Sequence, residues 1–410
     1  MGWHTGFFWI KQITMLNTPY ATTASPSCQE FTRQLCLHGD TYVTNAPFKV
    51  TSINMDGEEL PAIWNTSNDP YISWVCSLLN SFGPAVRAEL KLIPTSTVSR
   101  RLFNGLSHVA EFLLKRSGLG GGVFVENWFL PTTLYPQQRT AHSIIHAVTA
   151  LEKQAIDQKL GHLPIFVRSL TPVLHEDIIT KLQHHGFLLI PTRQIWLADN
   201  IQDGSWRQRS HNKRDLSLER KKAASTEWIE GKDFSDADFE RSLFLYNQLY
   251  RGKYPEFNPE FTLSYLKTAV ATGFMKFYGL RSVSQSNNET HHPNHPPSSN
   301  PAPLSGFVGI VRRDHIFTTP LFGYDLTQPT KEGLYRRLML KVSLEAEQHQ
   351  GILHCSGGAD QFKSLRGAQT HIEYAAVWIN HLPLSQRAIL QTLAKTINTL
   401  IAPFVTKKSF

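Results

Sequence analysis

Cysteine is scarce in this chain, and long apolar runs are absent. The 410 residues include four cysteines, Cys28, Cys36, Cys76 and Cys355. They form no C-x-x-C pair and have no zinc-site spacing with histidine, so the sequence argues against a disulfide-rich scaffold or a zinc domain. No run approaches the ~18 apolar residues of a membrane span. So few thiols in so long a chain are typical of a reducing compartment, and we expect a cytoplasmic protein.

The first residues lack the features of a targeting segment. They contain no basic n-region, and Lys11 interrupts a short apolar run, so we expect no cleaved signal peptide. Gly6 occupies the position where a myristoylation motif has Ser or Thr, which argues against a lipid anchor. The sequence is compatible with a start at Met1 or at Met15.

Positive charge exceeds negative charge. The chain has 41 Lys and Arg against 33 Asp and Glu, a formal net charge of +8. Such an excess favours an anionic partner such as a nucleic acid, a phosphorylated cofactor or an acidic membrane surface, with plain solubility charge as an equal alternative. The hydrophobic content of 41% supports a sizeable core, and the length suits two or three domains.

The first half of the chain alternates between strands and helices. Residues 1–40 are rich in Thr, Ser and Pro, so we expect a partly flexible segment there, followed by a domain over residues 41–205. Strands are expected near Tyr42 and at 48–53, 123–125, 164–168, 187–190 and 194–197, and helices at 77–92, 98–116, 139–159 and 173–185. The helix at 98–116 has apolar residues at helical spacing, namely Leu102, Leu106, Val109, Phe112 and Leu113. This alternation is typical of an α/β fold, with 187–190 and 194–197 as paired strands.

The second half begins with a basic stretch at 207–222, which holds seven Lys and Arg against two acids. Helices are then expected at 235–251, from Asn258-Pro259 and at 331–350, and strands at 275–280, 306–311, 316–322, 352–355 and 372–378. Residues 282–303 are dense in Ser, Asn, His and Pro, which predicts a flexible insertion. Its histidines, His291, His292 and His295, could catch a metal, but no carboxylate or thiol joins them, so we expect no metal site.

The last segment, residues 383–410, is predicted to form a basic amphipathic helix. We prefer packing against its own domain to peripheral contact with a membrane.

Lys363 is the most informative single residue. It follows Phe362 and precedes Gly367, where the chain is expected to turn after the strand at 352–355. A fixed cation in such a place can stabilise a developing oxyanion, and a solvated loop lysine is an equal alternative.

The element order over residues 206–380, with the Phe362-Lys363 and Arg366-Gly367 turn, resembles the GNAT acyltransferase superfamily in its Fem-like and CelD-like branch. In that branch an aromatic-Lys-x-x-(aromatic or Arg)-Gly turn follows the strand after the long helix. The stretch 209–223 is similar to the R-x-x-x-R-x-x-x-R-K-A helix that often opens this domain. Residues 362–383 are similar to the ends of uncharacterised bacterial GNAT-like proteins, and residues 166–197 resemble a degenerate copy of the same unit.

This resemblance implies a mixed α/β sheet of tandem GNAT-like domains, a degenerate one at 41–205 and an acyltransferase domain at 206–382. It implies an N-acyltransferase that moves an acyl group to an amine from acyl-CoA, a carrier-bound acyl group or an aminoacyl-tRNA. Acyl-CoA would be a co-substrate, and no tightly bound cofactor is expected. The alternative is a catalytically silent protein of the same fold that binds nucleic acid or another polyanion through its basic helix.

In Fem-type aminoacyltransferases the lysine of this turn faces the scissile acyl bond, a role that falls here on Lys363. The candidates for a general base are Asp325, which follows the strand at 316–322, and Glu373 and Tyr374, one of which would face the core. Each of the three is more often structural than catalytic in such a place. The residues expected to bind the donor are Gly333, Tyr335, Arg336, Phe362, Arg366 and Gly367, and those expected to bind an anion are Arg209, Lys213, Arg214 and Arg220.

One feature departs from the resemblance. Typical members that use acetyl-CoA carry an R/Q-x-x-G-x-G/A loop at the start of the long helix, where backbone amides bind pyrophosphate. Residues 328–336 occupy this place and contain a single glycine, Gly333. The sequence therefore leaves the acyl donor open, together with the acceptor, the pathway, the oligomeric state and any activity of the first domain.

Overall fold

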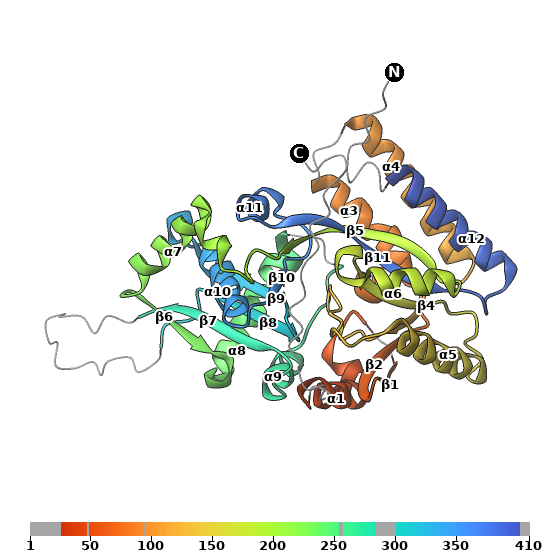
Figure 1. Cartoon of the computed structure of the whole chain (residues 1–410), viewed down its shortest axis with the longest axis horizontal. Helices are drawn as coiled ribbons and strands as arrows, with labels where there is room; N and C mark the ends of the chain where they lie inside the picture. Colours follow the sequence, from red (N-terminus) through yellow and green to blue (C-terminus); the bar gives the residue numbers. More distant parts are fainter. Residues whose placement is uncertain (1–25, 47–48, 93–95, 254–256, 284–300, 402–410) are drawn as a thin grey trace, which may run out of the picture.

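The computed structural model describes residues 26–46, 49–92, 96–253, 257–283 and 301–401. The described strands form one mixed sheet with helices on both faces (Figure 1). The strands are β1 (Lys49–Met55), β2 (Glu58–Asn65), β3 (Gly122–Val125), β4 (Ile165–Leu170), β5 (Leu188–Ala198), β6 (Thr226–Glu230), β7 (Lys276–Ser282), β8 (Gly306–Arg313), β9 (Ile316–Tyr324), β10 (Ile352–His354) and β11 (Gln369–Trp378). Their order across the sheet is β1-β2-β3-β4-β11-β5-β10-β9-β8-β7-β6.

The helices follow the expected positions closely in most cases. They are α1 (Pro26–Tyr42), α2 (Leu78–Phe82), α3 (Pro84–Leu92), α4 (Thr97–Arg116), α5 (Ala141–Asp157), α6 (Pro172–His184), α7 (Ser210–Lys222), α8 (Asp236–Asn247), α9 (Leu263–Ala271), α10 (Leu334–Gln348), α11 (Asp360–Leu365) and α12 (Leu384–Thr396). The helix expected at 331–350 is observed as α10, and its Leu334, Leu338 and Val342 are buried.

The two halves of the chain repeat one order of elements. In the first half β3 and β4 are parallel and joined by α5, and α6 then leads to β5. In the second half β9 and β10 are parallel and joined by α10, and α11 then leads to β11. This repeat confirms the expected mixed α/β fold with a tandem arrangement.

The last strand of each half is exchanged between the halves. β11 pairs with β4 of the first half, and β5 pairs with β10 of the second half. The two exchanged strands also pair with each other along nine residues of β11, from Gln369 to Val377. The halves are therefore joined through the centre of one continuous sheet.

The prediction of two paired strands at 187–190 and 194–197 is wrong, because these residues form the single strand β5. A proline normally interrupts a strand, since it cannot donate to the ladder. Here Pro191 pairs with Tyr374 and Arg193 with Glu373, so the register shifts by one residue at Thr192. This bulge accommodates Pro191 without ending the strand.

The segment predicted as flexible at 1–40 contains a packed helix from Pro26. α1 contacts β1 and β2 of the first half and α9 of the second half. Its Phe31 is fully buried and stacks on Phe274 with ring centroids 4.3 Å apart. The expected strand start near Tyr42 is accordingly wrong, because Tyr42 is the last residue of α1; residues 1–25 lie outside the described part of the chain.

Three other predictions need correction. The helix expected at 77–92 is divided at Gly83 into α2 and α3. Asn258 does not start a helix, because its side chain accepts a hydrogen bond from Trp74 and donates to Tyr250 O; α9 begins after Thr262, whose hydroxyl caps it. The apolar spacing in α4 also does not mark a core face, since Leu102, Val109, Phe112 and Leu113 are exposed.

The last described helix packs onto the protein, as preferred. In α12 and the turn that follows it, Leu390, Ala394 and Ile397 are buried, and the helix lies against β5 and α4 (Figure 1). None of the helices in the described ranges has the length and apolarity needed to cross a membrane. The predicted insertion at 282–303, with its three histidines, lies almost entirely outside the described residues.

Candidate active site

Lys363 lies where two parallel strands separate. β10 pairs with β9 over three positions that end at His354 and Thr318, and β9 then continues to Tyr324 without it. The chain after His354 forms an irregular loop at 355–359 and enters α11, which carries Lys363. The expected turn is thus a short helix. Ligands of α/β sheets commonly bind outside the carboxyl ends of parallel strands, which is where this loop lies.

The Lys363 side chain is buried, with 5% of its surface exposed. Its Nζ donates hydrogen bonds to the backbone oxygens of Ser356 at 3.1 Å and Gly357 at 2.6 Å. Burial lowers the pKa of Lys363 to about 8, and Arg193 acts in the same direction, while Cys355 and Asp360 oppose them. Lys363 is therefore not the solvated loop lysine that the sequence left open.

An ion pair between Glu373 and Arg193 supports the same loop. Glu373 of β11 accepts hydrogen bonds from Arg193 of β5, from Nε at 3.0 Å and from Nη2 at 3.1 Å. Burial alone would raise the pKa of Glu373, but Arg193 outweighs this effect and the pKa is lowered. Arg193 Nη1 also donates to Ser356 Oγ at 3.1 Å, so the pair is tied to the loop above Lys363.

His354 completes this network as a neutral ring. Its Nδ1 accepts a hydrogen bond from Ser356 N, so we assign the ring proton to Nε2, which lies 3.7 Å from Glu373 Oε2. Burial lowers the pKa of His354 to about 4, although the Glu373 carboxylate opposes this. The imidazole thus positions the loop backbone without adding charge at neutral pH.

The first half of the chain contributes two further residues. The guanidinium groups of Arg168 (β4) and Arg193 (β5) each lie 5.4 Å from the ring centre of Trp74. Arg168 also donates to Val75 O, and burial lowers its pKa to about 10. This region therefore brings cations and carboxylates together: Glu373 binds Arg193, and Asp360 interacts with Lys363.

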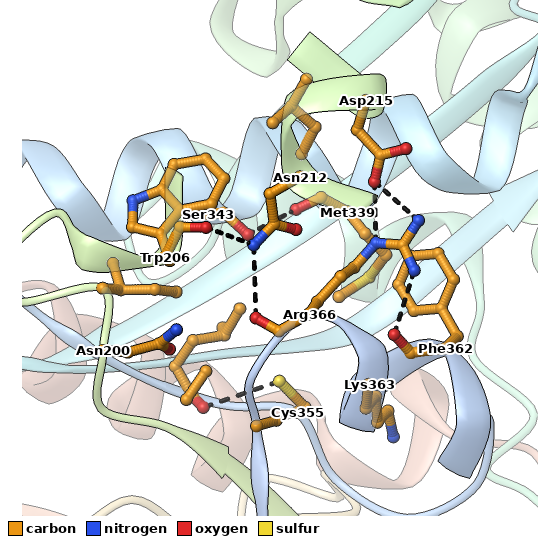
Figure 2. A pocket seen from close by; sticks show the side chains of 15 residues that line it. Asn200, Trp206, Asn212, Asp215, Met339, Ser343, Cys355, Phe362, Lys363 and Arg366 are labelled. Atoms are coloured by element: carbon orange, nitrogen blue, oxygen red, sulfur yellow. Dashed lines mark hydrogen bonds and ion pairs between the residues drawn. The ribbon is translucent and has the colours of Figure 1, made fainter. Parts of the chain in front are cut away.

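Four of the residues expected to bind the donor come together beside α11, where Phe362 and Arg366 lie near Asp215 (Figure 2). The rings of Tyr335 and Phe362 lie 4.6 Å apart, and the Arg366 guanidinium covers the Phe362 ring. Arg336 and Arg366 both bind Asp215 of the basic helix α7, at 2.6 and 2.7 Å.

Gly367 turns the chain after α11 with a φ of +96°. A Cβ at this position would lie 2.6 Å from Asn200 Nδ2 and 2.9 Å from Arg209 Nε, so the site requires glycine. Arg209, which we expect to bind an anion, is therefore adjacent to the donor-binding set.

A small cavity lies between these two groups of residues. Its walls include Cys355, Phe362, Lys363, Arg366 and Asn212, and its volume is about 30 Å³ (Figure 2). One water needs roughly 10–15 Å³ measured in this way, so the cavity has room for about two waters and not for a substrate. Burial raises the pKa of the Cys355 thiol to about 11, so it is a poor nucleophile at neutral pH.

The other two base candidates are not part of this network. Asp325 pairs with Arg241 at 2.8 Å and accepts hydrogen bonds from Thr327, and these contacts outweigh burial and lower its pKa. Tyr374 is half-buried and follows Glu373 on β11, so the two side chains point to opposite faces of the sheet.

Sequence reasoning missed Arg193, His354, Arg168 and Trp74. Polar residues inside apolar strand segments, such as Arg168 after Ile165-Phe-Val and His354 after Ile352-Leu, are the signal that could have found them.

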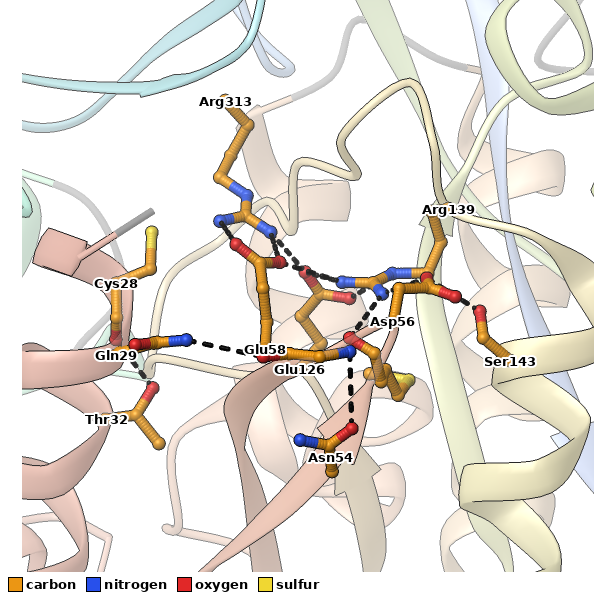
Figure 3. Close-up of polar contacts among 12 residues, drawn as sticks. Cys28, Gln29, Thr32, Asn54, Asp56, Glu58, Glu126, Arg139, Ser143 and Arg313 are labelled. Atoms are coloured by element: carbon orange, nitrogen blue, oxygen red, sulfur yellow. Dashed lines mark hydrogen bonds and ion pairs between the residues drawn. The ribbon is translucent and has the colours of Figure 1, made fainter. Parts of the chain in front are cut away.

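A second buried cluster of charges joins the halves away from Lys363 (Figure 3). Arg313 of β8 binds Glu58 at 2.7 Å and Glu126 at 3.3 Å, and Arg139 binds the same two carboxylates and Asp56. Burial raises the pKa of Glu126, although both arginines oppose this. No group of three or more His, Cys, Asp or Glu side chains with metal-site geometry is found within the described ranges. We interpret the cluster as structural.

Comparison with known proteins gives structural matches alone. No family model and no curated protein sequence matches this chain. Among solved structures, FemX is 9% identical over 90% of this chain and 93% of its own, with a TM-score of 0.48. L-PGS from Bacillus licheniformis is 10% identical over 92% and 99%, with a TM-score of 0.46. A tandem GNAT protein from the clavulanic acid biosynthesis pathway is 12% identical over 62% and 75%, with a TM-score of 0.32.

The names FemX and tandem GNAT are those of the groups that the sequence resembles. All three TM-scores are below 0.5.

Replacement of Lys363 by Met should change how stability depends on pH. The pKa of this lysine is about 8 in the folded chain and about 10.4 when unfolded, so the unfolded chain binds more protons between these values. The wild-type free energy of unfolding should therefore gain up to about 3 kcal/mol from this group as pH rises from 8 to 10.5. The variant should be more stable than wild type at pH 7, and this advantage should shrink by pH 10.5.

Chemical denaturation at both pH values measures this difference, and Lys331→Met, at an exposed lysine, is the control. An advantage of Lys363→Met that is the same at both pH values would show that burial does not lower the pKa.

Replacement of Arg313 by Met should lower the free energy of unfolding by about 3–5 kcal/mol, because it leaves two buried carboxylates, Glu58 and Glu126, with Arg139 as their remaining cation. Arg312→Met on the same strand is the matched control, since Arg312 is exposed and should have a much smaller effect. Denaturant unfolding of both variants measures this, and equal losses would contradict the structural role of the cluster.

Proposed function

We propose that this chain is an acyl- or aminoacyltransferase that uses an amine as acceptor, and that Lys363 supplies positive charge at the reacting carbonyl. The observation that carries this proposal is a buried ammonium group whose hydrogen bonds go to two carbonyls and not to a carboxylate. Burying such a charge costs stability, and strongly perturbed lysines of this kind concentrate at functional sites.

The reaction that suits this arrangement is nucleophilic acyl transfer. The lone pair of the acceptor amine attacks the donor carbonyl, a C–N bond forms, and the carbonyl electron pair moves to oxygen. The resulting oxyanion is stabilised by the positive charge of Lys363. When the oxyanion reforms the carbonyl, the C–S or C–O bond to the leaving group breaks, and the leaving group takes up the proton that the amine loses.

The carboxylates have a different role in this proposal. Asp325 and Glu373 are each ion-paired with an arginine and have a lowered pKa, which makes them weak proton acceptors. We propose that Glu373 holds Arg193 in place and that Asp325 fixes the end of β9. Tyr374 faces away from this network and has no part in the proposed reaction.

A donor that carries phosphates suits the charges beside the site. Exposed cations of α7 form no ion pair with any described residue, namely Lys213, Arg214, Arg220 and Lys221. The same helix carries Asp215, which holds Arg336 and Arg366 next to Phe362. Acyl-CoA and aminoacyl-tRNA both present an acyl group together with phosphates, so we propose one of them as the donor.

Loss of the Lys363 ammonium should slow transfer strongly. Acetyl-CoA, longer acyl-CoAs and free CoA are first tested by thermal shift, where a ligand at ~100 times its Kd stabilises the protein by about 2.7 kcal/mol. Aminoacyl-tRNAs are tested next in the same way.

With the donor identified, Lys363→Met should lower the single-turnover rate by about 10²–10³. The matched control is Lys341→Met, at a half-buried lysine of α10 that lies over Tyr278. Unchanged transfer in Lys363→Met would refute the assignment.

A second candidate function, binding of a nucleic acid without catalysis, is favoured by the unpaired cations of α7 alone. Binding of bulk tRNA through this helix should weaken as salt increases, because each phosphate contact releases counterions.

The double substitution Lys213→Gln/Arg214→Gln should reduce the slope of log K against log salt by about 2. Fluorescence anisotropy at several salt concentrations measures the slope. Arg101→Gln/Lys115→Gln, at exposed cations of the distant helix α4, is the control and should leave it unchanged. Equal effects of both pairs would indicate nonspecific attraction, not a site on α7.

A further inference from the structure

The loop between β10 and α11 has an unusual backbone that is fixed from several sides. Ser356, Gly358 and Ala359 have positive φ values of 59°, 70° and 52°. For Ser and Ala this conformation is costly, and it persists where surrounding contacts enforce it. Side-chain hydrogen bonds fix Ser356 within this loop. Its N–H donates to His354 Nδ1, and its Oγ accepts from Arg193 Nη1.

The carbonyl groups of this loop point inward. Ser356 O accepts hydrogen bonds from Lys363 Nζ and from Trp196 N of β5, at 3.1 Å each. Gly357 O accepts from the same Nζ at 2.6 Å. Two successive peptide groups thus turn their negative ends toward one buried ammonium.

The N–H groups of these peptides must therefore point outward. In a trans peptide the C=O of one residue and the N–H of the next point in opposite directions, and the described chain contains no cis peptide. The N–H groups of Gly357 and Gly358 accordingly point away from Lys363. Positive φ values on both sides of Gly357 are of the kind that makes anion-binding concavities from successive N–H groups.

The outer side of the loop is open to a ligand. Gly357 and Gly358 are exposed, and their N–H groups donate to no atom of the described residues. A Cβ added at Gly358 would meet no atom within 4 Å, whereas one at Gly357 would lie 3.3 Å from Gln194 O, so the free space is at Gly358. Two unpaired donors therefore lie over a buried positive charge, with aligned peptide dipoles between them and Lys363.

We infer that the N–H groups of Gly357 and Gly358 form the binding site for a negatively charged oxygen, and that Lys363 acts through them as a positioning residue. The inference rests on the proposed function and changes how the lysine works. Lys363 fixes the two peptides by their carbonyl oxygens and reinforces their dipoles, and the backbone amides touch the oxyanion. Preorganised donors of this kind cost no reorganisation during the reaction.

A titration by NMR tests this site without any acyl donor. The full-length protein is labelled with ¹⁵N-glycine and titrated with methylphosphonate, a small tetrahedral oxyanion. The amide protons of Gly357 and Gly358 should shift downfield as they bind the anion. In Lys363→Met this binding should be at least about tenfold weaker, because the two peptides lose the ammonium group that fixes and polarises them.

Lys341→Met is again the matched control and should bind methylphosphonate as wild type does. Absence of a shift at both glycines in the wild type would overturn the inference. An unchanged affinity in Lys363→Met would overturn the positioning role. A shift of the Lys363 Nζ resonance in ¹⁵N-lysine protein, with the two glycine amides unaffected, would show instead that the lysine binds the anion directly.

Two oxygens share this chemistry, the oxyanion of the tetrahedral intermediate and a phosphate oxygen of the donor. If the amides bind the intermediate, Lys363→Met should lower kcat and kcat/KM by the same factor. If they bind a donor phosphate, KM should rise with kcat unchanged. The NMR result does not depend on turnover, so a bound anion in a protein that transfers no acyl group would refute the proposed function and leave the anion site intact.

Discussion

The pairing of β5 with β11 is the interaction on which the rest of the structure depends. These strands are the last of their respective halves, and each has its other edge against the opposite half. Their register places Arg193 directly across from Glu373. A slip of one strand by one residue would turn its member of this ion pair to the other face of the sheet. The bulge at Thr192 accommodates Pro191 and keeps this register.

The Arg193–Glu373 ion pair is connected to the loop at 355–359 through Ser356. Arg193 donates a hydrogen bond to the hydroxyl of Ser356, and Lys363 donates one to its carbonyl oxygen. The N–H of Ser356 donates to His354. A buried ammonium and a strained loop are each unfavourable alone. Together they compensate one another, because the loop carbonyls solvate the lysine and the lysine fixes the loop. A protein that had to be stable and nothing more would gain by an apolar residue at position 363.

The sequence predicted the fold better than the site. The helices α4, α5, α6 and α10 were predicted at nearly their observed positions, with apolar spacing as the signal for α4 and α10 and the His184-His185-Gly186 end as the signal for α6. The sequence could not reveal the exchange of β5 and β11, since strand pairing between distant segments leaves no local signal. The same limit explains why Arg193 was missed: its partner Glu373 is 180 residues away. Motif reasoning placed Phe362, Arg366, Tyr335 and Arg336 in one group, and the structure brings these four together around Asp215.

A small cavity lies against Lys363. Its volume of about 30 Å³ has room for about two waters and not for an acyl group. The outer side of the loop presents exposed glycines with unpaired N–H groups. A carbonyl that approaches there meets the positive ends of two peptide dipoles before it could reach the ammonium itself. A lysine placed beneath the backbone can thus stabilise charge above it while only 5% of its own surface is exposed to solvent, which would weaken its field.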